Sequence, residues 1–225
     1  MAALTVVFDL DGTLVDTAPD LIETLNVVFV REGLPPVAYA EARNMIGGGV
    51  RRMIESALQF EGRPLRTHEV DRMLADFLAY YAVHIADRSR PFPGLVSALD
   101  LLAKQGCRFA VCTNKLEKLS RLLLDTLGLA ARFAAICGQD TFGIQKPDPE
   151  ILRRTIGAAG GDLSHAVMVG DSETDIATAR AAGVPVVAVD FGYSEAPIAK
   201  FGPDRLISHF DELVPAVFEL VTRGR

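Results

Sequence analysis

Short apolar runs alternate regularly with helical stretches along the chain after the breaker Pro-Phe-Pro-Gly at residues 91–94. The apolar residues follow one another without alternating with polar ones, which is typical of strands covered on both faces of a parallel sheet. Strands that alternate with helices in this way predict βαβ units. We expect strands at residues 108–112, 133–137, 166–169, 184–189 and, as a short one, 205–207, and helices at 95–105, 116–127, 150–159, 174–182 and 211–221.

The chain opens with another apolar strand, at residues 4–8, which ends at Asp9. From about residue 18 to 87 the pattern is helical, with glycine and proline breakers and no convincing strand. We therefore predict an α/β fold: a Rossmann-like, doubly wound parallel sheet with a small all-helical cap domain inserted after the first strand. The core would comprise residues 1–16 and 88–225, and the cap residues 17–87.

Composition excludes several kinds of partner. The chain of 225 residues has a net charge of −6 and a pI near 5.3, which argues against a basic face for nucleic acid. It has no apolar run of about 18 residues for a membrane span and no basic segment typical of a signal peptide. The three cysteines form no C-x-x-C pair. We expect a cytoplasmic protein, monomer or homodimer, without a nucleic-acid or membrane partner.

Polar residues follow the predicted strands at the points where these end. In a doubly wound sheet, ligands bind outside the carboxyl ends of the strands. These positions are Asp9-Leu10-Asp11, Thr113-Asn114-Lys115, Gly170-Asp171 and the loop that holds Lys146-Pro147. Residues from distant parts of the chain are thus predicted to meet in one site.

Four aspartates define the chemistry of this predicted site. Asp9 and Asp11, two apart on an extended segment, can face one ligand, one as a nucleophile on phosphorus and the other as an acid/base. Asp171 and Asp175 lie four apart at a strand end and helix start. Each pair could instead serve only a turn or a helix cap. Together, four converging carboxylates need a cation, and oxygen ligands favour Mg²⁺. The histidines, at 68, 84, 165 and 209, show no zinc spacing.

Thr113, Asn114 and Lys146 complete a site for a phosphoryl group. Thr113 and Asn114 can donate hydrogen bonds after their strand, and Lys146 adds a compact positive charge. Positioning and charge neutralisation are what phosphoryl transfer requires. A lysine before a proline is otherwise commonly a solvated residue.

These residues resemble the four motifs of the haloacid dehalogenase superfamily, in the family's order and over the whole chain. The motifs are Asp9-Leu10-Asp11-Gly12-Thr13-Leu14-Val15-Asp16-Thr17, Thr113-Asn114, Lys146-Pro147 and Gly170-Asp171-Ser172-Glu173-Thr174-Asp175. The resemblance implies that Asp9 becomes an aspartyl-phosphate and that Asp11 is the acid/base. It also implies that Mg²⁺ is held by Asp9, the backbone carbonyl of Asp11 and Asp171, with Asp175 in support, and that Thr113, Asn114 and Lys146 bind the phosphoryl group.

The resemblance also bears on the substrate. Dehalogenating members lack the second aspartate, Asp11, so a phosphatase or phosphomutase is implied. Residues 45–50, 111–115 and 192–194 look most like the phosphoglycolate phosphatase branch. In residues 47–49 no strand precedes the glycines and the G-x-G-x-x-G spacing fails. We expect this loop, with Gly48 and Arg51 as candidate ligands, to face an anionic substrate tail, although a plain interhelical turn would look the same.

The predicted activity is therefore Mg²⁺-dependent hydrolysis of small phosphate monoesters, with 2-phosphoglycolate first. Another phosphatase, a pyrophosphatase and a β-phosphoglucomutase-like enzyme stay open as alternatives within the superfamily. A non-catalytic binding protein on this scaffold is a more distant one. Such a protein should have lost one of the residues that carry the chemistry, and all of them are present.

Overall fold

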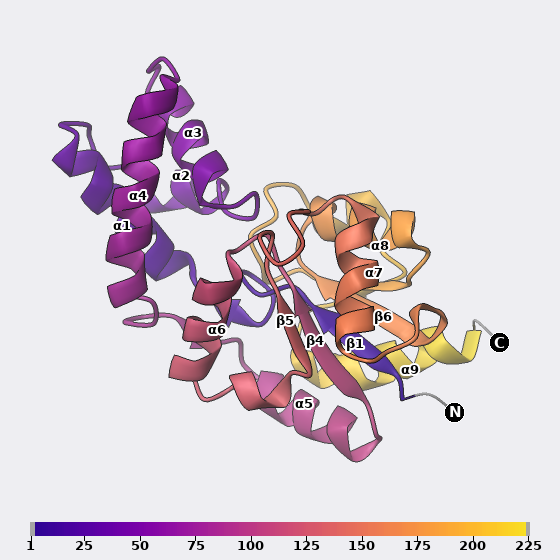
Figure 1. Cartoon of the computed structure of the whole chain (residues 1–225). Helices are drawn as coiled ribbons and strands as arrows, with labels where there is room; N and C mark the ends of the chain where they lie inside the picture. The colour runs from indigo at the N-terminus through magenta and orange to yellow at the C-terminus, as the bar shows by residue number, and fades with distance from the viewer. Residues whose placement is uncertain (1–2, 224–225) are drawn as a thin grey trace.

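A six-stranded parallel sheet forms the centre of the protein in the computed structural model, which describes residues 3–223 (Figure 1). The strands are β1 (Thr5–Phe8), β4 (Arg108–Cys112), β5 (Ala135–Cys137), β6 (Ala166–Gly170), β7 (Val186–Val189) and β8 (Arg205–Ile207). Their order is β5-β4-β1-β6-β7-β8, so β1 lies between β4 and β6. The prediction that the first strand joins the same sheet is confirmed. The chain order reverses beside β1, which is where such sheets place their ligands.

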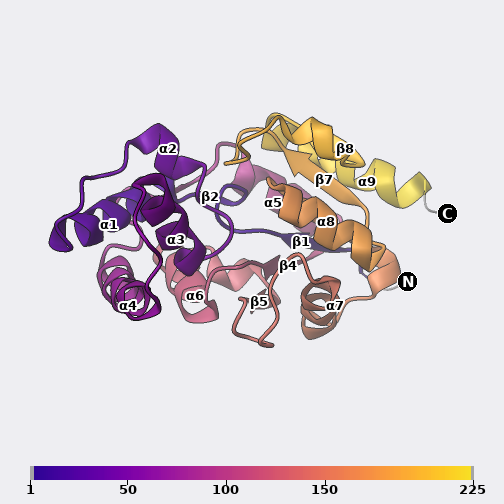
Figure 2. The ribbon, with the colours of Figure 1, turned by 90° about the horizontal axis from the view of Figure 1, so that it is seen from above.

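Helices cover both faces of the sheet (Figure 2). The helices α5 (Leu95–Lys104), α6 (Glu117–Thr126) and α9 (Leu213–Arg223) pack on one face, and α7 (Pro149–Ala158) and α8 (Glu173–Ala182) on the other. Alternate residues of β1 divide between the two apolar cores: Val6 and Phe8 belong to the first and Val7 to the second. Burial on both faces explains why the strands are apolar throughout.

Four further helices lie between β2 (Val15–Asp16) and β3 (Arg90–Pro91), beside the sheet in Figure 1. They are α1 (Ala18–Arg31), α2 (Tyr39–Arg43), α3 (Val50–Phe60) and α4 (Thr67–Val83), and we call them the helical insert. Within residues 18–87 the structure has no strand, as predicted. The apolar core of the insert runs on into that of the α5–α6–α9 face. The assignment of residues 17–87 as a separate cap domain stays a prediction.

Two short strands were missed at the two crossings between the sheet and the insert. Strands β2 and β3 pair antiparallel, Val15 with Pro91 and Asp16 with Arg90. Two-residue strands carry no polarity pattern, and a proline argues against a strand. Asp20 ties the same crossings together, because its carboxylate accepts from the backbone N–H of Arg88 and Ser89.

Several smaller features complete the fold. Short 3₁₀ helices, which were not predicted, lie at Ala130–Arg132, Leu163–His165, Ile198–Phe201 and Phe210–Glu212. The last of these replaces the first turn of the helix expected at 211–221. None of the helices described between residues 3 and 223 combines the length and apolar character needed to span a membrane.

Candidate active site

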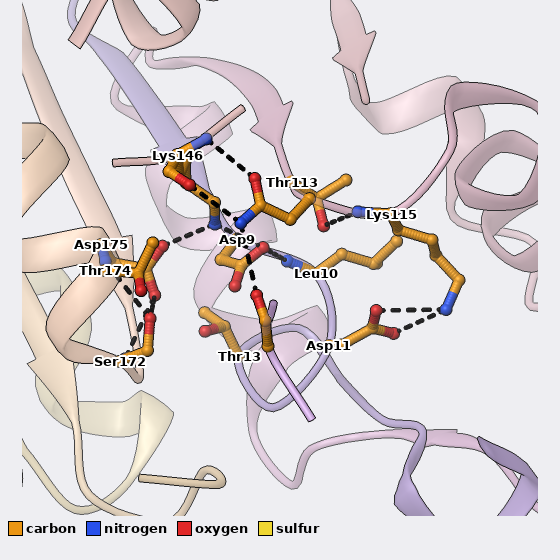
Figure 3. Close-up of polar contacts among 12 residues, drawn as sticks. Asp9, Leu10, Asp11, Thr13, Thr113, Lys115, Lys146, Ser172, Thr174 and Asp175 are labelled. Carbon is orange, nitrogen blue, oxygen red and sulfur yellow. Dashed lines mark hydrogen bonds and ion pairs between the residues drawn. The ribbon is translucent and has the colours of Figure 1, made fainter. Parts of the chain in front are cut away.

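The predicted site residues meet at the carboxyl edge of the sheet (Figure 3). Asp9 follows β1 directly, and its backbone N–H donates to the carbonyl of Val169 on β6 at 2.9 Å. Thr113 follows β4 and Asp171 follows β6, while Lys146 comes from the loop between β5 and α7. The prediction that strand ends from distant parts of the chain share one site is therefore confirmed.

Three carboxylates form a buried cluster at this edge. Asp9, Asp171 and Asp175 each offer one oxygen within 4.8 Å of the others. Burial raises the pKa of Asp9 to about 6, against the lowering effect of Lys146. Burial, together with the charges of Asp175 and Asp9, raises the pKa of Asp171 to about 8. Buried carboxylates this close resist joint ionisation, so the cluster has the composition and the electrostatic need of a cation site.

Fixed hydrogen bonds orient the members of this cluster. Asp171 accepts from the Thr13 hydroxyl at 2.7 Å and from the backbone N–H of Tyr193 at 2.8 Å. Asp175 forms a capping box with Ser172 at the start of α8, so the predicted helix cap is present. The alternative that Asp171 and Asp175 serve only as a helix cap is incomplete, because Asp175 also forms an ion pair with Lys146. One residue thus anchors the helix and the site.

Lys146 is the cation of the cluster. Its Nζ lies 2.9 Å from Asp9 Oδ1 and 2.6 Å from Asp175 Oδ1, and its side chain is 1% exposed. Burial acts against its charged form, but the charges of Asp175 and Asp9 raise the pKa of Lys146 above its ordinary value. With one lysine for three carboxylates, an ionised cluster retains an excess of negative charge that a divalent cation would balance.

Asn114 fixes the loop that carries Lys146. Its side-chain Oδ1 accepts from the backbone N–H of Lys146 at 2.8 Å, and its Nδ2 donates to the carbonyl of Lys146 at 3.2 Å. The Asn114 amide therefore braces Lys146. The neighbouring Thr113 hydroxyl accepts from the backbone N–H of Lys115 at 3.2 Å, which leaves the hydroxyl's own proton for another acceptor. Direct contact of either side chain with a phosphoryl group stays a prediction.

The fourth predicted carboxylate, Asp11, does not join the cluster, so the expected convergence of four is corrected to three. Its carboxylate is turned toward Lys115, whose Nζ donates to Oδ1 at 2.9 Å and Oδ2 at 3.1 Å (Figure 3). Lys115 also donates to the Tyr81 hydroxyl of α4 at 2.9 Å. The Asp11 carboxylate is therefore bound by Lys115, which lies outside the cluster. The proposed metal contact of Asp11 runs through its backbone carbonyl.

Lys115 is a site residue to which the sequence alone assigned no role. Its side chain is only 3% exposed. Burial acts against its charge, but the charge of Asp11 and the Tyr81 hydroxyl raise the pKa of Lys115 above its ordinary value. The only signal was its place directly after Thr113-Asn114, and lysines at such positions are mostly solvated.

Two neighbouring hollows with shared lining residues lie between the helical insert and the sheet edge. The inner pocket has a volume of about 30 Å³, and the outer cleft about 590 Å³. Asp9, Asp11 and Thr113 line the inner pocket, and Lys146 lines the outer cleft. Gly49, Val50, Asn114 and Lys115 line both.

The loop of Gly47, Gly48 and Gly49 lines these hollows, and the two candidate ligands, Gly48 and Arg51, lie in the outer one. Gly47 and Gly49 line the inner pocket, and Gly48 lines the outer cleft. Arg51 also lines the cleft, but it pairs with Asp71 of α4, and its side chain is 46% exposed. Binding of substrate by Gly48 and Arg51 stays a prediction.

Tyr193 connects the acidic cluster to the crossing into the helical insert; the sequence analysis noted residues 192–194 for their family resemblance but gave Tyr193 no role. Besides the bond from its backbone N–H to Asp171, its hydroxyl accepts from the backbone N–H of Thr17 and Ala18 at 2.6 and 2.9 Å. The same hydroxyl donates to Asp16 Oδ1 at 2.6 Å. One residue therefore holds a cluster carboxylate and the start of α1.

Gly12 is required by the close packing of this region. Its φ is +84°, which favours glycine, and a Cβ there would lie 2.4 Å from Asp171 Oδ2. The glycine after Asp11 therefore lets the loop pass directly beside the Asp171 carboxylate.

Comparison with known proteins agrees with this fold and site. The family model of haloacid dehalogenase-like hydrolases matches residues 6–189. A phosphoglycolate phosphatase of Mesorhizobium japonicum is 49% identical over 224 residues, covering 100% of this chain and 99% of that protein. One of Agrobacterium fabrum is 44% identical, covering 97% and 94%. The crystal structure of a predicted phosphoglycolate phosphatase from Haemophilus somnus has a TM-score of 0.87 at 30% identity, covering 95% and 97%.

The fold, the site and these relatives together define a hydrolase with a Rossmann-like fold and an acidic cluster at the sheet edge. The chain belongs to the haloacid dehalogenase-like hydrolase family. The resemblance seen in its motifs is confirmed.

Proposed function

We propose that the protein is a Mg²⁺-dependent phosphatase that converts 2-phosphoglycolate to glycolate and phosphate. The observation that carries the proposal is the buried set of Asp9, Lys146, Asp171 and Asp175 at the switch point of the sheet. Relatives that are 40–49% identical and named phosphoglycolate phosphatase support the substrate.

Asp9 and Asp11 would carry the two chemical steps. An oxygen of Asp9 attacks phosphorus, so that the bond between phosphorus and the leaving oxygen breaks and an aspartyl-phosphate forms. Asp11 gives a proton to the leaving oxygen and glycolate departs. Asp11 then takes a proton from water, which attacks the phosphorus and restores Asp9. Lys146 and the Thr113 hydroxyl lie where they can neutralise and orient the phosphoryl oxygens.

The acidic cluster fits Mg²⁺ because its donors are hard carboxylate oxygens in a buried place that carries excess negative charge. Asp9, Asp171 and the backbone carbonyl of Asp11 would hold the ion, with Asp175 behind them. Bound there, Mg²⁺ supplies positive charge that favours the approach of a phosphate anion to the Asp9 carboxylate.

A panel of substrates tests the proposed function. We would measure kcat/KM for phosphate release in Mg²⁺ with 2-phosphoglycolate, pyrophosphate, glucose 1-phosphate and several sugar phosphates. We expect 2-phosphoglycolate to exceed the others by about 100-fold, which corresponds to about 2.7 kcal/mol of transition-state discrimination. Equal rates would support a generalist phosphatase. Conversion of glucose 1-phosphate to glucose 6-phosphate without net release would show a mutase.

A further inference from the structure

A second buried lysine stands beside the acid/base and has no task in the proposed chemistry. Lys115 Nζ donates to both oxygens of Asp11 and to the Tyr81 hydroxyl, and it lies 4.6 Å from the centre of the Tyr81 ring. Burial of a lysine costs desolvation free energy unless its charge is paired or hydrogen-bonded. Asp11 neutralises the charge in this structure. That pairing alone does not explain why the lysine faces a pocket.

The inner pocket surrounds this lysine with apolar side chains and with the carboxylates of Asp9 and Asp11. Its wall includes the apolar side chains of Leu21, Ile46, Val50 and Met53, all from the helical insert. Lys115 is the one cationic side chain among the described residues that line it. Its charge is therefore the one on the described part of this wall that attracts an anionic group of a substrate.

The position of Lys115 relative to Asp11 fixes where this anion would sit along a substrate. The leaving oxygen must come within hydrogen-bond distance of Asp11 to receive a proton. Lys115 Nζ lies 2.9 and 3.1 Å from the two oxygens of the same carboxylate. In 2-phosphoglycolate one methylene separates the leaving oxygen from the carboxylate. With the leaving oxygen at Asp11, the substrate carboxylate would therefore lie within reach of Lys115.

The helical insert adds partial positive charge from the opposite side. Gly49 and Val50, at the N-terminus of the eleven-residue helix α3, line the inner pocket. Free backbone N–H groups at a helix start favour an anion. Tyr81, also from the insert, keeps the Lys115 ammonium in place.

We infer that Lys115 determines specificity by binding a carboxylate of the leaving group, one carbon from the leaving oxygen. The inference rests on the proposed function and names the group that selects its substrate. As the leaving oxygen approaches Asp11, one of the two Lys115–Asp11 hydrogen bonds passes to the substrate carboxylate. Phosphate esters with a neutral tail offer Lys115 no such partner and leave Asp11 bound to it.

Lys115→Met tests the inference with two substrates of similar shape. Propyl phosphate has one heavy atom fewer than 2-phosphoglycolate and ends in a methyl group in place of the carboxylate. We expect Lys115→Met to lower kcat/KM for 2-phosphoglycolate about 100-fold or more and for propyl phosphate less than about 10-fold. The preference between the two substrates should fall at least about 10-fold. An equal loss for both substrates overturns the inference and makes Lys115 a positioning residue for Asp11.

Two further variants serve as controls for this experiment. Lys115→Gln keeps a side-chain donor for Asp11 and removes the charge, so it should show the same loss of preference if Lys115→Met fails to fold. Tyr81→Phe keeps the charge and removes one hydrogen bond, so it should retain the preference within about fivefold. Retained preference in a folded Lys115→Gln, judged by circular dichroism and Tm, overturns the inference.

The wild-type protein separates the inference from the proposed function. If wild type does not prefer 2-phosphoglycolate over propyl phosphate, the proposed substrate is wrong and the inference fails with it. If wild type does prefer it and the Lys115 variants keep that preference, only the inference fails. Inhibition by glycolate, measured in wild type and Lys115→Gln, reports on the same contact without turnover, and we expect it to weaken about 10-fold or more in the variant.

Discussion

The site has two halves that are built differently, and each is organised around a buried lysine. On the phosphoryl side, Lys146 binds Asp9 and Asp175, and these groups come from the sheet edge, a loop beside it and the first turn of α8. On the leaving-group side, Lys115 binds Asp11 from the sheet edge and Tyr81 from the helical insert. The first half is thus complete within the core, whereas the second requires both parts of the chain.

This difference separates the chemistry from the choice of substrate. Bond making at phosphorus is the same for every phosphate ester, so its groups belong on rigid strand ends. The leaving group differs between substrates, and the apolar walls of the pocket proposed to receive it come from the insert. We therefore expect changes in the first half to affect all substrates alike and loss of the Lys115 charge in the second half to affect some substrates more than others.

The strongest test of this division is Asp9→Asn. The variant retains the shape of the side chain and removes the nucleophile, so we expect kcat for every substrate in the panel to fall by at least about 10³-fold. Circular dichroism should show an intact fold. Substantial activity with any one substrate would contradict the role of Asp9 and the uniformity of the phosphoryl side.

Lys146→Met should be the next largest effect, and it contrasts directly with Lys115→Met. Loss of Lys146 leaves buried carboxylates without a partner, which costs about 3–5 kcal/mol of stability in comparable cases. We expect kcat/KM to fall about 10²-fold or more and by the same factor for 2-phosphoglycolate and propyl phosphate. A loss confined to one substrate would show that both lysines select the leaving group.

Mg²⁺ should stabilise the protein more at high pH than at low pH. The raised pKa values of Asp9, about 6, and Asp171, about 8, mean that the metal-free folded protein holds protons that the unfolded chain has released. Stability without metal therefore falls as pH rises from about 4 to about 8. Mg²⁺ would take the place of those protons. The increase in the protein's Tm on addition of Mg²⁺ should therefore be a few degrees larger at pH 8.5 than at pH 6.

This prediction has a clear control. Asp171→Asn should reduce the pH dependence of the Tm increase with Mg²⁺, because the raised pKa of Asp9 alone remains, and should remove most of the activity. An increment that is equal at both pH values in wild type would place the ion away from the acidic cluster.

The smallest expected effect belongs to Arg51, which the sequence analysis offered as a substrate ligand. Its guanidinium is half-exposed and already pairs with Asp71 on α4. Exposed ion pairs contribute about 0–1 kcal/mol. We expect Arg51→Ala to change kcat/KM for 2-phosphoglycolate by less than about threefold. A loss of about 10-fold or more, selective for this substrate, would restore Arg51 as a ligand on the leaving-group side.

The phosphoryl side was largely predictable from the sequence because its residues follow strands. A strand end in a parallel sheet fixes where the next side chain lies, so the strand pattern alone is enough to place Asp9, Thr113 and Asp171 together. Lys146 was placed by its motif. The helical insert was predictable in kind, since helical periodicity runs through it, but the packing of its helices on the core was not.

The leaving-group side was less predictable because it depends on pairings across long stretches of chain. Lys115 and Asp11 lie 104 residues apart, and the Tyr193 hydroxyl lies 176 residues from the Thr17 amide that it binds. No sequence pattern near these residues indicates either contact. A lysine and a tyrosine are common surface residues, so only the three-dimensional structure distinguishes these two from the rest.

The pairing of β2 with β3 has a consequence for how such a protein can diversify. The chain leaves the sheet and returns to it at neighbouring residues, Val15 opposite Pro91 and Asp16 opposite Arg90. A segment with adjacent ends can be lengthened, shortened or exchanged as a cassette while the ends of the interrupted scaffold stay where they are. New leaving-group preferences could thus arise by recombination at these two crossings, with Asp9 and Lys146 inherited unchanged.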